Sequence, residues 1–149
     1  MNKMLPALAF VVIAALSATP ARSATLADVC GRFNDGGNIL RCVQAADGRY
    51  TDPKALDVCN RFSHGDNIFQ CIRAVAGRSY QPSDIALCNR FQDGANVLRC
   101  MADAGRPYNS ERDAREAMRE LVATCKALFS NDSDRLSCIE AGLRPAKVE

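Results

Sequence analysis

The chain has 149 residues, with 19 basic and 17 acidic side chains and a formal net charge of +2. This near balance excludes the clearly basic surface that nucleic-acid-binding domains need. The length suits one small domain with a modest core, a class that disulfides commonly reinforce.

The first 23 residues have the features of a secretory signal peptide. Lys3 gives a positive start, an apolar run extends from Leu5 to Leu16, and small residues follow up to Ser23. The apolar run is shorter than the roughly 20 residues of a bilayer span, which disfavours the alternative of an uncleaved anchor. We predict cleavage after Ser23, or at Ala21 or Ala24, and a periplasmic or secreted mature chain without a membrane span.

Residues 24–149 are predicted to form a single helical domain built on a cysteine repeat. Two cysteines bracket eleven residues, and this arrangement recurs with a period of 29 residues. A fourth copy is one residue longer and has lost the glycine and the first arginine of the others. A fixed period of this length indicates stacked supersecondary units. The units, numbered 1 to 4, span about residues 24–48, 49–77, 78–105 and 106–142.

Each unit is predicted to be a helical hairpin, two helices joined by a tight turn. The first helix starts near a proline in units 2 and 3, Pro53 or Pro82, and runs to Phe62 or Phe91. The turn glycines are predicted to follow this helix at Gly36, Gly65 and Gly94. The second helix is predicted to begin after an N-cap and to end at a glycine. The N-caps are Asn38, Asn67, Asn96 and Asp134, and the terminal glycines are Gly48, Gly77, Gly105 and Gly142.

The eight cysteines are predicted to form one disulfide within each hairpin. Eight cysteines allow 105 pairings, and cross-unit bridges such as Cys42–Cys59 remain open alternatives. Repeat symmetry favours the within-unit pairs Cys30–Cys42, Cys59–Cys71, Cys88–Cys100 and Cys125–Cys138. In the chain-entropy model each such loop stabilises its hairpin by about 3 kcal/mol. The predicted fold is therefore all-α: tandem disulfide-stapled αα-hairpin repeats that form a small α-solenoid or a compact helical bundle.

Unit 4 differs from the others in having a longer first helix, predicted over residues 110–129. The apolar residues of this helix form one stripe, and its charged residues form a solvated face. A longer, more charged last unit is typical of a terminal cap on a stack. The predicted core recurs at three positions per unit: Phe33, Phe62, Phe91 and Phe129; Leu40, Phe69, Leu98 and Leu136; Val43, Ile72, Met101 and Ile139.

The sequence contains no recognisable catalytic or metal-binding constellation. An eleven-residue gap between cysteines is far wider than the two to four residues typical of zinc ligands, and no C-x-x-C redox motif occurs. His64, the single histidine, occupies a turn position where other units have aspartate. Acid pairs such as Asp132 and Asp134 lie at turn and cap positions, where carboxylates are ordinary. We predict no cofactor, no metal and no enzymatic activity.

Two rows of arginines are the candidate partner-binding residues. Arg32, Arg61 and Arg90 repeat at one position, and Arg49, Arg78 and Arg106 repeat at another, close to Tyr50, Tyr80 and Tyr108. Arginine and tyrosine are enriched where proteins bind one another. The structural alternative assigns the first row to ion pairs with Asp28 and Asp57 four residues earlier, and the second row to carbonyls at helix ends.

In outline, hairpins that each carry a disulfide resemble secreted helical-repeat proteins of the Sel1-like, cysteine-rich kind. The resemblance is one of architecture, and no site is carried over from it. We expect an exported module that binds another protein or an envelope component. One alternative is an inhibitor or effector of an extracytoplasmic enzyme that acts through the turn from Phe62 to Asn67. The other is a hydrolase with a cleft that holds a carboxyl group of shifted pKa. Partner identity and oligomeric state stay open.

Overall fold

The computed structural model describes residues 22–108 and 111–143, and it confirms the predicted all-α fold. The predicted signal peptide lies outside the described residues, apart from Arg22 and Ser23. Across the described ranges, no helix combines the length and the apolar character needed to cross a membrane.

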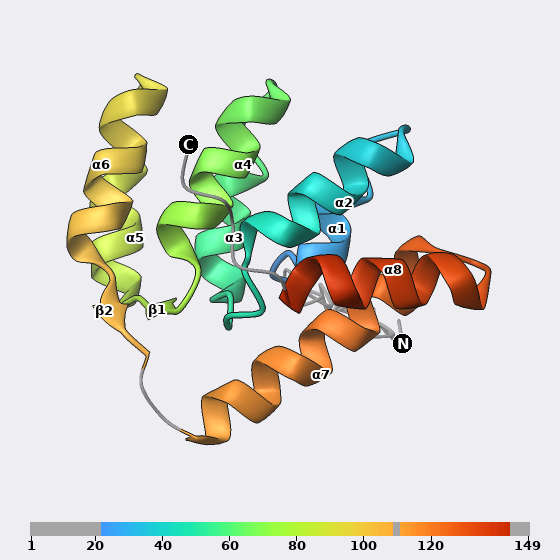
Figure 1. The fold of residues 1–149 in the computed structure, drawn as a ribbon. Helices are drawn as coiled ribbons and strands as arrows, with labels where there is room; N and C mark the ends of the chain where they lie inside the picture. Colours follow the sequence, from blue (N-terminus) through green and yellow to red (C-terminus); the bar gives the residue numbers. More distant parts are fainter. Residues whose placement is uncertain (1–21, 109–110, 144–149) are drawn as a thin grey trace, which may run out of the picture.

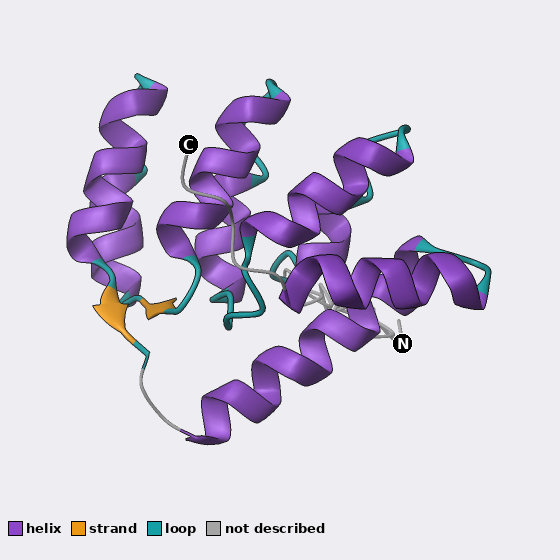
Figure 2. Cartoon of the chain, viewed as in Figure 1, coloured by secondary structure: helices purple, strands orange, loops and turns teal. Residues whose placement is uncertain are grey.

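Each unit contributes two helices to the fold (Figures 1 and 2). Two short strands at the starts of units 3 and 4 pair antiparallel, and the sequence gives no prediction of them. The bounds are α1 (Leu26–Cys30) and α2 (Gly36–Ala45) in unit 1, α3 (Pro53–Cys59) and α4 (Gly65–Val75) in unit 2, β1 (Arg78–Ser79), α5 (Pro82–Cys88) and α6 (Gly94–Ala104) in unit 3, β2 (Arg106–Pro107), and α7 (Glu111–Leu128) and α8 (Asp132–Leu143) in unit 4.

The four predicted disulfides are confirmed. Cys30–Cys42, Cys59–Cys71, Cys88–Cys100 and Cys125–Cys138 join the two helices of each unit, and no cysteine is left free. The paired Cα atoms lie 5.4 to 5.7 Å apart, within the ordinary range for disulfides. Helices of two to three turns are unstable alone, so these covalent links matter to every hairpin.

The second helices begin three residues earlier than predicted, because a different residue caps each of them. In unit 1 the carboxylate of Asp35 accepts hydrogen bonds from the N–H groups of Gly37 and Asn38 at 3.3 and 3.0 Å. Asp93 caps α6 in the same way, and Asn131 accepts from the Asp134 N–H at 2.8 Å. The predicted caps Asn38, Asn67, Asn96 and Asp134 therefore lie inside the first helical turn.

The turn glycines were also misassigned. Gly36, Gly65 and Gly94 are the first residues of α2, α4 and α6, and none of them has a positive φ. The left-handed conformation occurs instead at Gly48 (φ 61°) and Gly77 (φ 71°), just after α2 and α4 as predicted. Of the other predicted terminal glycines, Gly105 has a φ of −70° and Gly142 lies within α8.

The units do not pack in chain order. Unit 4 packs on unit 1 through the α1–α7 and α2–α8 contacts, while α4 packs on α2 and α6 packs on α4. The spatial order is therefore unit 4, unit 1, unit 2, unit 3, and Figure 1 shows α8 beside α2 at the opposite side from α6. Unit 4 covers the side of unit 1 that faces away from unit 2 and leaves the outer side of unit 3 uncovered.

The predicted core positions are buried or half-buried, with two exceptions at the ends of the row. Val43, Ile72 and Met101 are fully buried in successive units. Phe91 and Leu136 were predicted as core but are 42% and 62% exposed. Phe91 belongs to unit 3 and Leu136 to unit 4, so each end residue lacks the neighbouring unit that would cover it.

Candidate functional site

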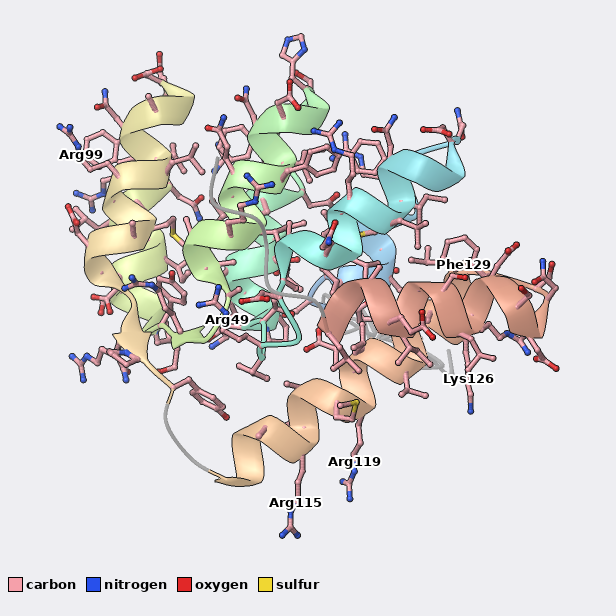
Figure 3. The ribbon with its side chains drawn as sticks, viewed as in Figure 1. Arg49, Arg99, Arg115, Arg119, Lys126 and Phe129 are labelled. Atoms are coloured by element: carbon pink, nitrogen blue, oxygen red, sulfur yellow. A yellow bond between two sulfur atoms is a disulfide. The ribbon has the colours of Figure 1, made fainter. Side chains whose placement is uncertain are left out.

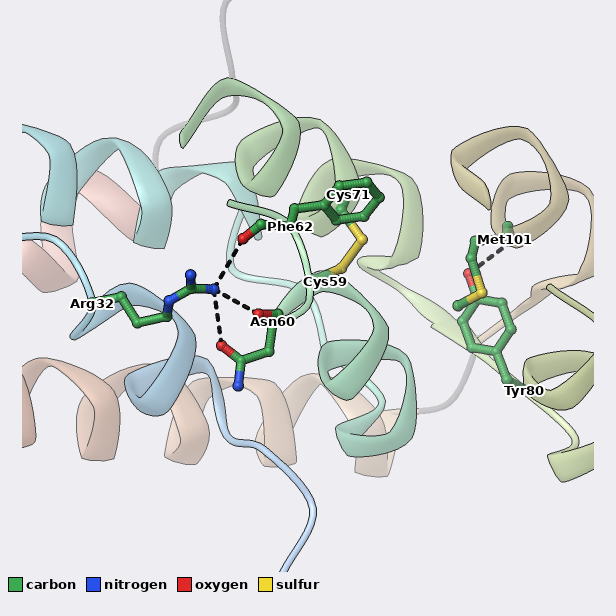
Figure 4. Close-up of a disulfide and its surroundings, with 7 residues drawn as sticks. All are labelled: Arg32, Cys59, Asn60, Phe62, Cys71, Tyr80 and Met101. Atoms are coloured by element: carbon green, nitrogen blue, oxygen red, sulfur yellow. Dashed lines mark hydrogen bonds between the residues drawn. A yellow bond between two sulfur atoms is a disulfide. The ribbon is translucent and has the colours of Figure 1, made fainter. Parts of the chain in front are cut away.

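Two arginines of the first row join neighbouring units. Arg32 donates from one terminal nitrogen to the Asn60 carbonyl at 2.6 Å, the Asn60 side-chain oxygen at 3.2 Å and the Phe62 carbonyl at 3.1 Å (Figure 4). Arg61 repeats this link one unit further along by donating to the side-chain oxygen of Asn89. These bonds satisfy groups at the end of the next unit's first helix, where free carbonyls need donors.

The predicted ion pairs within helices are not the partners of these arginines. Asp28 forms a capping box with Thr25, whose backbone and side-chain hydrogen bonds lower the pKa of the Asp28 carboxyl. Asp57 accepts a hydrogen bond from the backbone N–H of Ala24 at 2.6 Å. Both carboxylates are therefore used in local and inter-unit hydrogen bonds.

The second arginine row behaves differently at each unit. Arg78 donates to the Ala102 and Gly105 carbonyls at 2.8 and 3.0 Å, which is the helix-end role considered from the sequence. Arg49 is exposed and lies 3.4 Å from the Asp47 carboxylate. Arg106 is exposed on β2.

The tyrosines of the same loops make two kinds of contact, one within unit 3 and one between two loops. The buried Tyr80 hydroxyl donates to the Met101 carbonyl at 2.9 Å (Figure 4), and burial raises the pKa of this phenol to about 12. The rings of Tyr50 and Tyr108 stack with centroids 4.5 Å apart and an interplanar angle of 16°. Arg78 and the Tyr80 hydroxyl therefore tie the start of unit 3 to the end of its own second helix, α6, while the Tyr50–Tyr108 pair borders the space under α7.

The outer side of unit 3 exposes residues whose counterparts are buried between units. Val29 and Val58 are 0% and 2% exposed, whereas Leu87 at the equivalent position is 54% exposed. Arg90 is also different from its counterparts, because within residues 22–108 and 111–143 its side chain has no hydrogen bond or ion pair, whereas the side chains of Arg32 and Arg61 do. We call Leu87, Arg90 and Phe91 the unit 3 end face.

The opposite end of the row does not complement the unit 3 end face. Arg61 bonds Asn89, whereas the equivalent position of unit 4 holds Lys126. A Cβ added at Gly94 would lie 2.9 Å from Phe62, so glycine makes room for that ring. In unit 4 the first residue of the second helix is Asp132. If a second copy of this chain packed on the unit 3 end face, Arg90 would therefore meet the like charge of Lys126, and Phe91 would meet the carboxylate of Asp132.

A separate cleft lies between α7 and the loop that follows α2. It has a volume of about 900 Å³ and is lined by Tyr50, Thr51, Pro53, Arg115, Glu116, Arg119, Glu120 and Ala123. A second hollow of about 440 Å³ shares Tyr50 and includes Tyr108. Figure 3 shows the labelled side chains of Arg115 and Arg119 extending from α7 away from the other units.

The cleft holds a carboxyl group in a partly desolvated position. Glu120 accepts a hydrogen bond from the Thr51 hydroxyl at 2.8 Å, and Thr51 is fully buried. Burial raises the pKa of the Glu120 carboxyl, and the nearby Glu116 adds to this. The pKa of Tyr50 is raised to about 12, mainly by burial and then by the charge of Asp52.

Sequence reasoning missed Thr51 and Glu120. Helical spacing contained part of the signal, because Glu120 lies three residues after Ala117 and four before Thr124, and both of these are buried. Its partner Thr51 is 69 residues away, which no local pattern indicates. His64, by contrast, is exposed at the N-cap of α4 and makes no capping hydrogen bond.

The described residues contain no group of three or more histidine, cysteine or acidic side chains placed to hold a metal ion. The fold is thus an array of disulfide-stapled hairpins with an uncovered end face and a polar cleft under α7. No family model, curated protein or solved structure matches this chain.

Proposed function

We propose that this chain is an exported protein-binding module that docks another protein on its unit 3 end face. The observation that carries the proposal is the exposure of Leu87, 54%, at a position that is buried in units 1 and 2. Four disulfides support an oxidising, extracytoplasmic location. A leucine and a phenylalanine beside an arginine form the kind of surface that protein interfaces favour.

The neighbouring interfaces indicate what the partner offers. Arg32 and Arg61 each donate to the end of a helix, and Phe33 and Phe62 each lie against a glycine that begins a helix. A partner for Arg90 and Phe91 would present the same features, a helix end with free oxygen acceptors and a small residue beside it. We therefore propose a helical hairpin on a different protein, since Lys126 and Asp132 disfavour a second copy of this chain.

Site-specific photo-cross-linking in the source organism tests this proposal. A benzophenone amino acid at position 91 should cross-link one partner, and mass spectrometry should place the linked segment on a helical hairpin. Leu87→Asp should abolish the cross-link, because it places a charge where an apolar contact forms. The control is Leu136→Asp, since Leu136 is also an exposed leucine but lies on α8 at the other end.

Three results would overturn the proposal. The first is a partner that cross-links equally well from position 136. The second is a cross-link that survives Leu87→Asp. The third is a product that contains only a second copy of this chain, which would make the end face a self-association surface.

Of the two alternatives, an inhibitor or effector would act through a single protruding turn from Phe62 to Asn67. Phe62 is half-buried and would lie 2.9 Å from a Cβ at Gly94, so its ring is engaged between units 2 and 3. The hydrolase reading requires a cleft with a carboxyl of shifted pKa, and Glu120 meets that requirement. Tyr50 and Glu116 line the cleft beside Glu120 and can contact a bound ligand. We therefore propose a binding role for this cleft.

A further inference from the structure

We propose that the cleft under α7, lined by Tyr50, Glu116 and Glu120, binds an organic cation through an ammonium or guanidinium group. This site is separate from the unit 3 end face and does not depend on the docking proposal. It is formed by elements far apart in the chain, the segment between α2 and α3 at the start of unit 2 and the helix α7 in unit 4.

The shape of the cleft suits a small ligand or one extended side chain. Its volume of about 900 Å³ lies in the range of small-molecule sites in proteins. Tyr50 provides an aromatic wall and is held by its stacking on Tyr108. The Tyr50 carbonyl also accepts the N–H of Gly77 at 2.7 Å, which fixes the backbone of this wall.

The charges that face the cleft favour a cation. Asp52, Glu116 and Glu120 are carboxyl groups close enough to act on the Tyr50 hydroxyl, and two of them, Glu116 and Glu120, line the cleft. Arg115 and Arg119 line the cleft as well, and Figure 3 shows their side chains directed away from the neighbouring units. With these two guanidinium groups directed outward, the cleft offers a ligand two carboxylates and an aromatic ring, the chemistry that recognises ammonium and guanidinium groups.

The Glu120 carboxylate is held in place for such a contact. The Thr51 hydroxyl donates to one of its oxygens, so the orientation of the carboxylate is set before any ligand arrives. The backbone N–H groups of Thr51 and Leu26 also hydrogen-bond to this carboxyl group. A carboxylate has about four lone-pair sites, so it can still accept a donor from the ligand. Because Glu120 is partly removed from water, its charge is screened less than that of an exposed carboxylate. A cation should therefore bind to Glu120 more tightly than to an exposed carboxylate.

Two sources can supply this cation, a free polyamine or a lysine or arginine side chain of a peptide. Calorimetric titration of the oxidised protein with spermidine and with the tripeptide Gly-Lys-Gly distinguishes them, because only the second has a peptide backbone around the amine. Binding of either probe supports the site, and binding of the tripeptide alone assigns the ligand to a peptide. Absence of binding by both probes at millimolar concentration would overturn the proposal.

Matched variants locate the binding in the cleft. Glu120→Gln and Tyr50→Leu should each weaken binding about tenfold, the size expected for loss of a favourable charge or cation–π contact. Glutamine keeps an oxygen for the Thr51 hydroxyl, so Glu120→Gln should leave the fold intact. The control Asp103→Asn removes an equal charge from an exposed site on α6 and should leave the affinity unchanged. Equal weakening by Glu120→Gln and Asp103→Asn would contradict a defined site.

The pH dependence gives an independent readout. Only the ionised Glu120 carboxylate attracts a cation, and burial raises the pKa of this group. Affinity should therefore rise with pH through that pKa, and saturating spermidine should lower the pKa measured by carboxyl NMR. A Glu120 pKa that does not move on saturation would contradict the contact.

Discussion

Arg32, Arg61 and Arg90 show how one repeated residue takes different roles in different surroundings. Arg32 and Arg61 bond the next unit, whereas Arg90 lies where the row ends. The sequence alone makes the three residues equivalent. Their difference comes from whether another unit supplies helix-end oxygens within reach, which is a property of the packing.

Replacing these arginines by alanine should separate the two roles. Arg32→Ala removes bonds to the Asn60 and Phe62 oxygens and should lower the free energy of unfolding by about 1 kcal/mol, a modest loss because the site is exposed. Arg90→Ala should change it by less than about 0.5 kcal/mol. Guanidinium unfolding with the disulfides intact measures both. An equal loss for the two variants would contradict the inter-unit role of Arg32.

At the scale of elements, the second helix begins with a glycine in units 1 to 3, and in units 2 and 3 this glycine makes room for an aromatic ring. A Cβ at Gly65 would lie 3.1 Å from the Phe33 ring, and a Cβ at Gly94 would lie 2.9 Å from the Phe62 ring. At Gly36 nothing lies within 4 Å of such a Cβ. The same repeat position is therefore crowded in units 2 and 3 and open in unit 1.

Glycine-to-alanine substitutions should have opposite signs at these positions. Gly36→Ala should stabilise the protein by about 0.4–1 kcal/mol, because alanine restricts the unfolded chain and its backbone conformation here is ordinary. Gly94→Ala should destabilise it by about 1–3 kcal/mol through overpacking against Phe62. Thermal unfolding of the two variants gives the comparison, and equal shifts in Tm would show that the Phe62 ring moves aside without cost.

At the scale of the whole molecule, the units have unequal numbers of neighbours. Unit 1 lies between units 4 and 2, whereas unit 3 contacts unit 2 alone in the row. In arrays of this kind, stability is roughly a sum of unit and interface terms, so an end unit can open without its neighbours. Unit 1 cannot open without losing two interfaces.

Removing one disulfide at a time should reveal this difference. Each staple stabilises by about 3 kcal/mol in the chain-entropy model. Without Cys88–Cys100, amide exchange should rise mainly over residues 80–104, because unit 3 opens alone. Without Cys30–Cys42, exchange should rise in units 4, 1 and 2 together. Hydrogen-exchange mass spectrometry of the two double-alanine variants distinguishes these patterns, and a uniform rise in both would mean that the row unfolds as one unit.

Most of the local structure could be predicted from the sequence, with errors at helix starts. The cysteine spacing and symmetry predicted the hairpins and all four disulfides, which the structure confirms. The N-caps were wrong because asparagine at position 38 and aspartate at position 35 are both good capping residues, and the actual cap is the earlier one. Propensity cannot choose between two strong caps three residues apart.

The sequence by itself determined the hairpin, its disulfide and the apolar faces that units share, because these depend on residues within about 13 positions of each other. Only the tertiary structure decided that unit 4 covers unit 1 and leaves Leu87, Arg90 and Phe91 exposed. The same packing brings Glu120 to Thr51 across 69 residues. The physical reason is that repeated faces are chemically alike, so the order of units follows from which faces meet in three dimensions.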